Sequence, residues 1–175
     1  QIAWGQVALH VSVSDLFEEA LDPNDPTRDE RAGRWQSARV ESQRIAVRGR
    51  APEPISIVVT EHGPLLRSVF PDEPRANSLA LRWTGQAERS GVEALYRLQR
   101  CGDWSCFRAA LREVRAPAAT FLYSDATGAT GTQVAGDLPL RAIETGLLPL
   151  AGASRYYDWR GTADFDSLPS SYGAN

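Results

Sequence analysis

The chain has 175 residues, of which 42% are hydrophobic and 23% are charged, and its formal net charge is −3. These values are ordinary for a globular protein, and this length suffices to bury a sizeable core. The acidic balance, without any basic block, excludes nucleic acid and anionic membrane surfaces as expected partners. No apolar run approaches the roughly 20 residues that a membrane-spanning helix needs.

The inventory of reactive side chains is short. All 19 basic residues are arginine, so neither a lysine Schiff base nor a lysine general base is available. Cys101 and Cys106 match neither a redox motif nor half of a zinc site. With only His10 and His62 as further ligands, we do not expect zinc. The two cysteines form either a disulfide, if the protein is exported, or two partly buried free thiols.

The first third of the chain predicts strands and one long loop. The apolar, β-prone start predicts a buried strand over Gln1–Val13, followed by a short strand or a helical turn at Asp15–Leu21. The polar segment Asp22–Trp35, with two prolines, predicts an exposed loop. Alternation favours a strand with one wet face over Arg39–Arg48, and the run PISIVVT predicts a strong strand over Pro54–Thr60.

The next segment predicts a weak strand over Leu65–Phe70, a loop over Pro71–Asn77 and a strand over Ser78–Thr84. In the last of these, alternation puts Leu79, Leu81 and Trp83 on one face, with Trp83 as a core aromatic.

Helical spacing then replaces alternation. A capping box from Ser90 to Glu93 predicts a helix over Gly91–Arg100. Asp103 is the expected cap of a second helix, which ends before Pro117. The apolar stripe of this second helix predicts a core contact and consists of Trp104, Phe107, Leu111 and Val114.

The last part predicts a hairpin with strands over Thr120–Ser124 and Thr130–Ala135, in whose turn Asp125 accepts backbone amides. The tail from Asp137 to Asn175 is rich in Gly, Pro and Ser and is expected to be mostly irregular. Strands, two helices and a hairpin together predict the α+β class.

Five segments, in this order along the chain, resemble the middle of the β chain of penicillin acylases, a family of N-terminal nucleophile hydrolases. They are AWGQVALH at residues 3–10, TEHGPLL at 60–66, SLALRWTG at 78–85, the hairpin, and the run from RYYDWRG to the last residue. The resemblance implies an αββα sandwich of which residues 1–175 form a single segment, incomplete at both ends. It also implies that the nucleophile lies upstream of Gln1, and that an asparagine holding the oxyanion follows just after Asn175.

The chemistry that the resemblance implies is acyl transfer from an amide to water. An N-terminal Ser, Thr or Cys attacks the carbonyl with its own α-amine as base, and backbone amides hold the oxyanion. By position in the family pattern, Ala8 supplies one of those amides. Gln1 has neither a hydroxyl nor a thiol, so we expect the isolated chain to be inactive.

Other site residues have a functional and a structural interpretation. His10 lines the acyl pocket or the core, and His62, in a His-Gly-Pro turn, is expected to make a structural hydrogen bond rather than to act in a Ser-His-Asp triad. Asp15 matches one acid of the family's calcium site, but Ser12 stands where the other acid would be, so Asp15 is alternatively a strand-end residue. No other cofactor is expected. The acidic positions near the end, interpreted as a solvated loop, are Asp158, Asp164 and Asp166.

Three functional hypotheses follow. The first is a segment of an active amidase, whose partners are the α chain and the rest of the β chain, or a second copy through self-association. By resemblance, such an enzyme is periplasmic or secreted. The second is a catalytically inactive relative that serves as a structural or interaction subunit. The third is an unrelated ligand-binding α+β domain.

Overall fold

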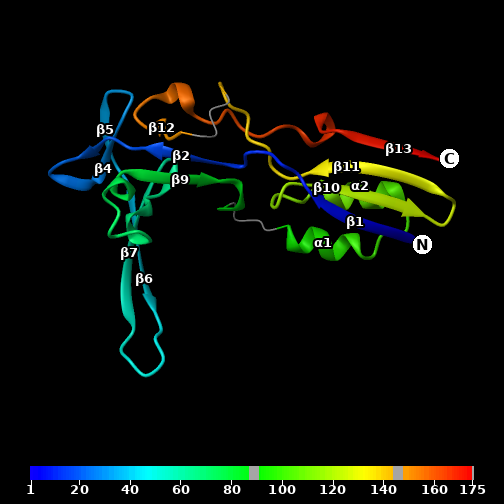
Figure 1. Ribbon diagram of the computed structural model, residues 1–175, viewed down its shortest axis with the longest axis horizontal. Coiled ribbons are helices and arrows are strands. Elements are labelled where there is room, and N and C mark those ends of the chain that lie inside the picture. The colour runs from blue at the N-terminus through cyan, green and yellow to red at the C-terminus, as the bar shows by residue number, and fades with distance from the viewer. Residues whose placement is uncertain (87–90, 144–147, 175) are drawn as a thin grey trace. The chain divides into compact units, whose positions relative to one another are not determined.

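The structure of the chain is a computed structural model that describes residues 1–86, 91–143 and 148–174. Its contacts divide the chain into two compact units (Figure 1). Unit 1 comprises Gln1–Val13, Thr84–Leu140 and Trp159–Asn175, and unit 2 comprises Ser14–Trp83 and Arg141–Asp158. The sequence predicts a single segment over residues 1–175 and does not indicate this division. The predicted α+β class is confirmed by mostly antiparallel sheets and two α-helices among the described residues.

Unit 1 contains a four-stranded antiparallel sheet in the spatial order β1, β10, β11, β13. The strands are β1 (Ile2–Ala8), β10 (Ala119–Asp125), β11 (Ala129–Ala135) and β13 (Ser170–Ala174). The predicted hairpin is confirmed by β10 and β11, whereas β13 lies in the tail that was predicted to be irregular. The strand predicted within Gln1–Val13 is confirmed over Ile2–Ala8. Its predicted burial is wrong, because β1 is an edge strand with no fully buried residue.

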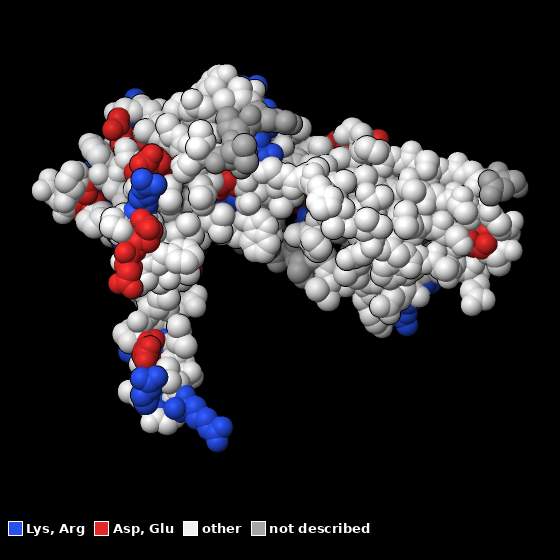
Figure 2. Space-filling model, in the orientation of Figure 1, with Lys and Arg blue, Asp and Glu red and all other residues white. Residues whose placement is uncertain are grey.

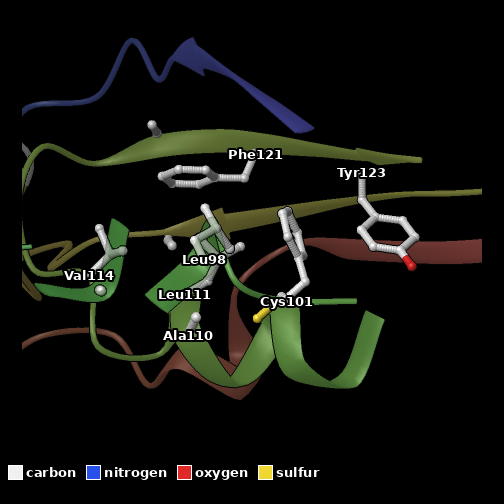
Figure 3. Packing of buried hydrophobic residues seen from close by; sticks show 11 residues of the cluster. Leu98, Cys101, Ala110, Leu111, Val114, Phe121 and Tyr123 are labelled. Carbon is white, nitrogen blue, oxygen red and sulfur yellow. The ribbon is translucent and has the colours of Figure 1, made fainter. Parts of the chain in front are cut away.

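Two helices pack on the apolar side of this sheet. They are α1 (Val92–Leu98) and α2 (Trp104–Leu111). Figure 3 shows Phe121 and Tyr123 of β10 facing Leu98 and Leu111 of the helices, and all four side chains are at most 3% exposed. The predicted stripe of the second helix is confirmed as core. The capping box proposed for the first helix rests on Ser90, which lies outside the described residues.

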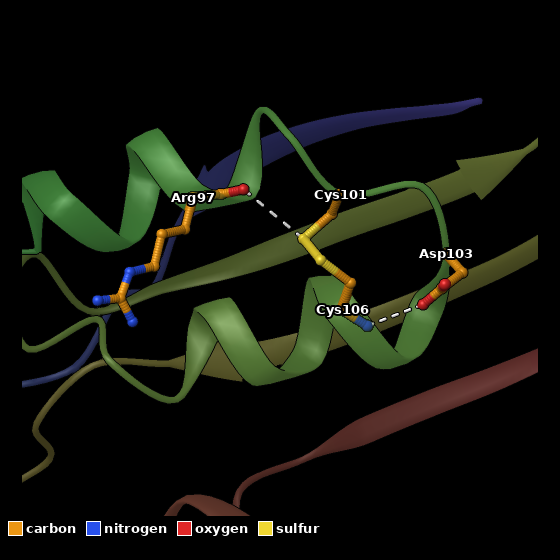
Figure 4. The surroundings of a disulfide bond; sticks show 4 residues. All are labelled: Arg97, Cys101, Asp103 and Cys106. Carbon is orange, nitrogen blue, oxygen red and sulfur yellow. Dashed lines mark hydrogen bonds between the residues drawn. A yellow bond between two sulfur atoms is a disulfide. The ribbon is translucent and has the colours of Figure 1, made fainter.

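The link between the helices is fixed by a cap and a disulfide (Figure 4). The side chain of Asp103 accepts a hydrogen bond from the backbone amide of Cys106 at 2.8 Å, which confirms it as the N-cap of α2. Cys101 and Cys106 are disulfide-bonded, with an S–S distance of 2.07 Å. Of the two alternatives for these cysteines, the structure therefore contains the disulfide.

The turn between β10 and β11 is organised by Asp125. Its Oδ1 accepts hydrogen bonds from the amides of Thr127 at 2.8 Å and Ala129 at 3.2 Å, and its Oδ2 accepts one from the Tyr123 hydroxyl at 2.9 Å. The Thr127 hydroxyl also donates to Oδ1 of Asp125, and this hydrogen bond is the largest cause of the lowered pKa of the carboxyl. The predicted role of Asp125 is thus confirmed.

Unit 2 contains three three-stranded sheets. The first has the order β12 (Leu150–Ala151), β2 (Ser14–Glu18), β9 (Leu79–Trp83). The second has the order β3 (Leu21–Asp22), β4 (Asp25–Arg31), β5 (Arg34–Ser37). The third has the order β6 (Arg39–Ile45), β7 (Glu53–Thr60), β8 (Gly63–Pro64). The core of this unit comes from the first and third sheets and the residue after β8, with Leu21 of β3 packed against it, and consists of Phe17, Val58, Leu65, Ala80 and Leu150.

Several predictions for unit 2 were correct and others were not. The strands over Arg39–Arg48 and Pro54–Thr60 are confirmed by β6 and β7, and Asp15–Leu21 resolves into the strand β2. The loop over Asp22–Trp35 is wrong, because this segment forms β4 and most of a hairpin. The weak strand over Leu65–Phe70 is wrong as well, because Leu66–Ser68 is a 3-10 helix. Trp83 is 45% exposed and is not a core aromatic, whereas Ala80 of the same strand is fully buried.

Candidate functional site

The C-terminal end of β1 presents a backbone amide to the open edge of the sheet of unit 1. Ala8, the last residue of β1, is exposed and pairs with Ala119, and no strand of the described residues lies on its other side. The amide of Ala126 donates to the carbonyl of Gln1 at 3.2 Å. This hydrogen bond determines which residues of β1 direct their backbone N–H and C=O groups toward β10. Peptide groups alternate in direction along an antiparallel strand. Ala8, an odd number of residues from Gln1, therefore directs its N–H away from β10.

His10 follows two residues after Ala8 in the same unit. Its side chain is exposed, and the turn around it is closed by a hydrogen bond from the amide of Val11 to the carbonyl of Leu9 at 2.9 Å. Of the predicted site residues, Ala8 and His10 thus belong to unit 1, whereas Asp15 belongs to unit 2. A role of His10 in a pocket wall stays a prediction.

Asp15 is buried between two arginines of unit 2. Its Oδ2 accepts a hydrogen bond from Nε of Arg141 at 2.7 Å, and its side chain is 2% exposed. Arg82 is its neighbour across the β2–β9 ladder, and the charge of Asp15 is one of the influences that raise the pKa of Arg82 against the lowering effect of burial. The carboxylate is therefore already neutralised by cations of the chain.

This environment does not fit a calcium ion. Calcium takes six to eight oxygen ligands, several of them carboxylates. In the ranges 1–86, 91–143 and 148–174, no three His, Cys, Asp or Glu side chains are arranged to hold one metal ion. Calcium at Asp15 stays a prediction that depends on oxygen ligands from outside this chain.

The other polar constellation of unit 2 is a buried ionic network, which we define as Glu19, Arg31, His62 and Asp158. Nδ1 of His62 lies 2.9 Å from Oε1 of Glu19, and its Nε2 lies 2.8 Å from Nη1 of Arg31 and 3.1 Å from Oδ1 of Asp158. Arg31 also donates to Oδ2 of Asp158 at 2.5 Å. Nε of Arg31 also lies 2.9 Å from Oε2 of Glu61, whose side chain is 55% exposed. One guanidinium and one imidazole are thus held between the two carboxylates of the network and the exposed carboxylate of Glu61.

Burial makes the pairing within this network obligatory. The side chains of Glu19 and His62 are each 1% exposed and that of Arg31 is 3% exposed. Burial by itself would raise the pKa of Asp158, but the hydrogen bonds from Arg31 and His62 outweigh it and the pKa is lowered. The ionised form of Asp158 is therefore the one that the fold favours.

The network is structural rather than catalytic. The ring of His62 stacks on Phe17 at 3.7 Å between centroids, and the adjacent hydroxyl of Thr60 donates to Glu19 at 2.6 Å. A general base must reach the proton that it removes from a substrate, and His62 is closed off from solvent. The predicted structural hydrogen bond of His62 is confirmed.

The acidic positions near the end do not form one solvated loop. Asp158 is part of the buried ionic network, so its interpretation as a loop residue in solvent is wrong. Asp166 lies in unit 1, where its carboxylate accepts hydrogen bonds from Arg108 at 2.8 Å and Arg112 at 2.7 Å. The partners of Asp158 and Asp166 are 54 to 127 residues away along the chain, so composition alone cannot reveal them.

Comparison with known proteins shows to which family the chain is similar. The sequence model described as penicillin amidase matches residues 1–175. The chain is 31% identical over 166 residues to the acyl-homoserine lactone acylase QuiP of Pseudomonas fluorescens Pf-5, and 33% identical over 165 residues to QuiP of Pseudomonas putida KT2440. Each match covers 94% of this chain and 20% of the relative, so the chain spans about one fifth of the length of these curated relatives.

Two further comparisons concern penicillin acylases. Penicillin acylase 2 proenzyme of Pseudomonas sp. SE83 is 31% identical over 127 residues, which covers 72% of this chain and 16% of that protein. The solved structure of a thermostable penicillin G acylase from Alcaligenes faecalis superposes with a TM-score of 0.82 at 24% identity, covering 98% of this chain and 31% of the other. This likeness confirms the predicted fold.

In the part of the chain that the structure describes, no helix is long and apolar enough to cross a membrane. The chain belongs to the penicillin amidase family.

Proposed function

We propose that this chain is part of an amidase that transfers an acyl group from an amide to water, and that the amide of Ala8 is one of its oxyanion donors. The observation that carries the proposal is the direction of this amide, which faces the open edge at the end of β1. Donors aimed at the developing oxyanion are among the largest contributions to acyl-transfer catalysis. Any residue other than proline supplies such an amide, so direction is what makes Ala8 a candidate.

The nucleophile comes from outside this chain in the proposed mechanism. The N-terminal Ser, Thr or Cys of the complete β chain attacks the acyl carbonyl, its α-amine takes the proton and returns it to the leaving amine, and water then releases the acid. His62, which is buried in a structural network, contributes nothing to this step. The partners of the chain are accordingly the α chain and the rest of the β chain.

The substrate class follows from the relatives. Those named above are acyl-homoserine lactone acylases and a penicillin acylase, and in both kinds of substrate a side-chain acyl group is joined to an amine through an amide. We therefore propose an N-acyl amide as the substrate. The disulfide between Cys101 and Cys106 supports a periplasmic or secreted enzyme, because such bonds persist in oxidising compartments.

A pair of proline substitutions tests the role of Ala8. Ala8→Pro in the full-length enzyme removes an amide that makes no bond to β10, and proline is tolerated on edge strands. We expect kcat for acyl-homoserine lactone hydrolysis to fall by about 100- to 1,000-fold. Gln6→Pro is the matched control, since the amide of Gln6 also faces away from β10, and it should leave kcat near that of the unsubstituted enzyme.

The outcomes separate the hypotheses. Full activity of Ala8→Pro, with the same thermal stability as Gln6→Pro, would contradict the proposed donor. Turnover by the 175-residue chain alone would contradict a nucleophile outside it. A full-length enzyme that lacks any amidase activity would favour the inactive, structural relative.

A further inference from the structure

The hairpin of β6 and β7 is exposed along most of its length. Every residue of β6 is exposed except Glu41, which is half-buried, and Val40 and Ile45 are 47% and 54% exposed. The hairpin extends away from the other strands of unit 2 (Figure 1). A two-stranded hairpin without a covering surface is at best marginally stable in water. The described residues of unit 2 leave both of its faces largely uncovered.

The outer edge of β6 presents unpaired peptide groups. Within residues 1–86, 91–143 and 148–174, β6 pairs in its sheet with β7 alone, and β8 lies on the other side of β7. The amide of Leu65 donates to the carbonyl of Val58 at 2.8 Å, so Val58 directs its peptide groups away from β6. Val40, directly opposite Val58, must then direct its own groups away from β7. By alternation Ser42 and Arg44 do the same, which leaves a row of three donors and three acceptors open.

The free half of the hairpin carries basic side chains. A shallow surface hollow of about 570 Å³ borders three cross-strand pairs of β6 and β7. It is lined by Ser42, Gln43, Arg44, Pro54, Ile55 and Ser56. Arg39 and Arg50 pair with carboxylates of the hairpin itself, whereas Arg44 and Arg48 form no ion pair with any described residue. Figure 2 shows basic side chains gathered at the free end of the hairpin.

We propose that β6 pairs with an additional strand, supplied by another segment of the same acylase polypeptide and carrying carboxylates that face Arg44 and Arg48. Strand addition at an open edge uses the unpaired peptide groups for affinity and side-chain contacts for specificity. The occupant comes from the same polypeptide because the chain spans only 20% of the relatives' length and 31% of the solved acylase chain. This inference rests on the proposed function in taking the chain as part of a larger amidase.

Amide hydrogen exchange tests the pairing without relying on activity. Two proteins are compared: the 175-residue chain alone, and the longer polypeptide that is expressed from the whole gene in which this chain is encoded. In the short chain, the amides of Val40, Ser42 and Arg44 should exchange rapidly, while those of Glu41 and Gln43, which face β7, should exchange more slowly than these three. In the longer product, exchange at the first three positions should slow by about 100-fold or more. Equally rapid exchange at these positions in both proteins would overturn the inference.

Two substitutions at Ser42 make the same test by stability. Ser42→Pro removes an outward donor, so it should leave the melting temperature of the short chain within about 2 °C and lower that of the longer product by more. Ser42→Ala keeps the amide and should change neither. Protection of Val40, Ser42 and Arg44 that rises with the concentration of the short chain would instead assign the edge to a second copy and overturn the proposed occupant. If the longer product hydrolyses the amide while the amides of Val40, Ser42 and Arg44 still exchange rapidly, the amidase proposal stands and the strand pairing of β6 is contradicted.

Discussion

Asp158→Asn removes one negative charge from the buried ionic network while keeping the size of the side chain. Arg31, whose side chain is 3% exposed, would lose its carboxylate partner at Nη2 and keep the ion pair of its Nε with Glu61, a side chain that is 55% exposed. Removing one partner of a fully buried pair costs about 3–5 kcal/mol. The side chain of Asp158 is 24% exposed, and the asparagine oxygen still accepts a hydrogen bond. We therefore expect the free energy of unfolding to fall by about 2 kcal/mol at pH 6.

The pH dependence of this loss is the sharper measurement. The pKa of Asp158 in the fold lies below its ordinary value of 3.8. A lowered pKa means that the ionised group stabilises the fold above the unfolded pKa, and that this stabilisation is lost as the pH falls through the folded pKa. Urea unfolding of the wild type and Asp158→Asn should thus differ fully at pH 5, and the difference should close as the pH falls below 3.8.

Asp166→Asn is the control, because it makes the same change at a carboxylate that also pairs with arginine. The side chain of Asp166 is 51% exposed, so water and salt screen its interactions. We expect a clearly smaller loss that decreases further at high salt. Equal losses for the two variants, or a difference for Asp158→Asn that persists unchanged to pH 2, would refute the reasoning about burial.

Two further predictions concern stability. Asp29 is 1% exposed, and burial raises the pKa of its carboxyl. Because a raised pKa of an acid means that stability is lost as the pH rises through it, Asp29→Asn should unfold at a higher temperature than the wild type at pH 7 and show little gain at pH 3. The disulfide between Cys101 and Cys106 closes a short loop, so its reduction should lower the free energy of unfolding by about 2 kcal/mol. Calorimetry with and without reductant measures this loss. The control is the double variant Cys101→Ala, Cys106→Ala, whose stability should not respond to reductant.

The elements that the sequence predicted well are those whose signals are local. The run PISIVVT forms β7 because β-branched residues favour a pleated surface. Asp103 caps α2 three residues before the amide that it binds, and Asp125 binds amides two and four residues away. In each case the cause of the structure lies within a few residues of the pattern.

The elements that the sequence mispredicted depend on distant partners. The segment DPTRDER reads as a loop by composition, yet it forms β4, since Asp29 binds Gln36 and Arg31 binds Asp158, which is 127 residues away. Trp83 shares a strand with Ala80, and only the packing of β9 against β2 decides that the smaller residue faces the core. Asp15 likewise owes its environment to Arg141, 126 residues away.

The candidate oxyanion donor shows what a strand register adds to a sequence motif. The resemblance predicts Ala8 by position, but the direction of its amide depends on parity, since successive peptide groups in a strand point to opposite sides. The pairing of Gln1 with Ala126 sets that parity for the whole of β1. A slip of one residue against β10 would turn the amide of Ala8 into the ladder and that of Val7 outward. The comparison of Ala8→Pro with Gln6→Pro therefore tests the register together with the role, because after such a slip both substitutions would remove a ladder hydrogen bond and both proteins would lose stability.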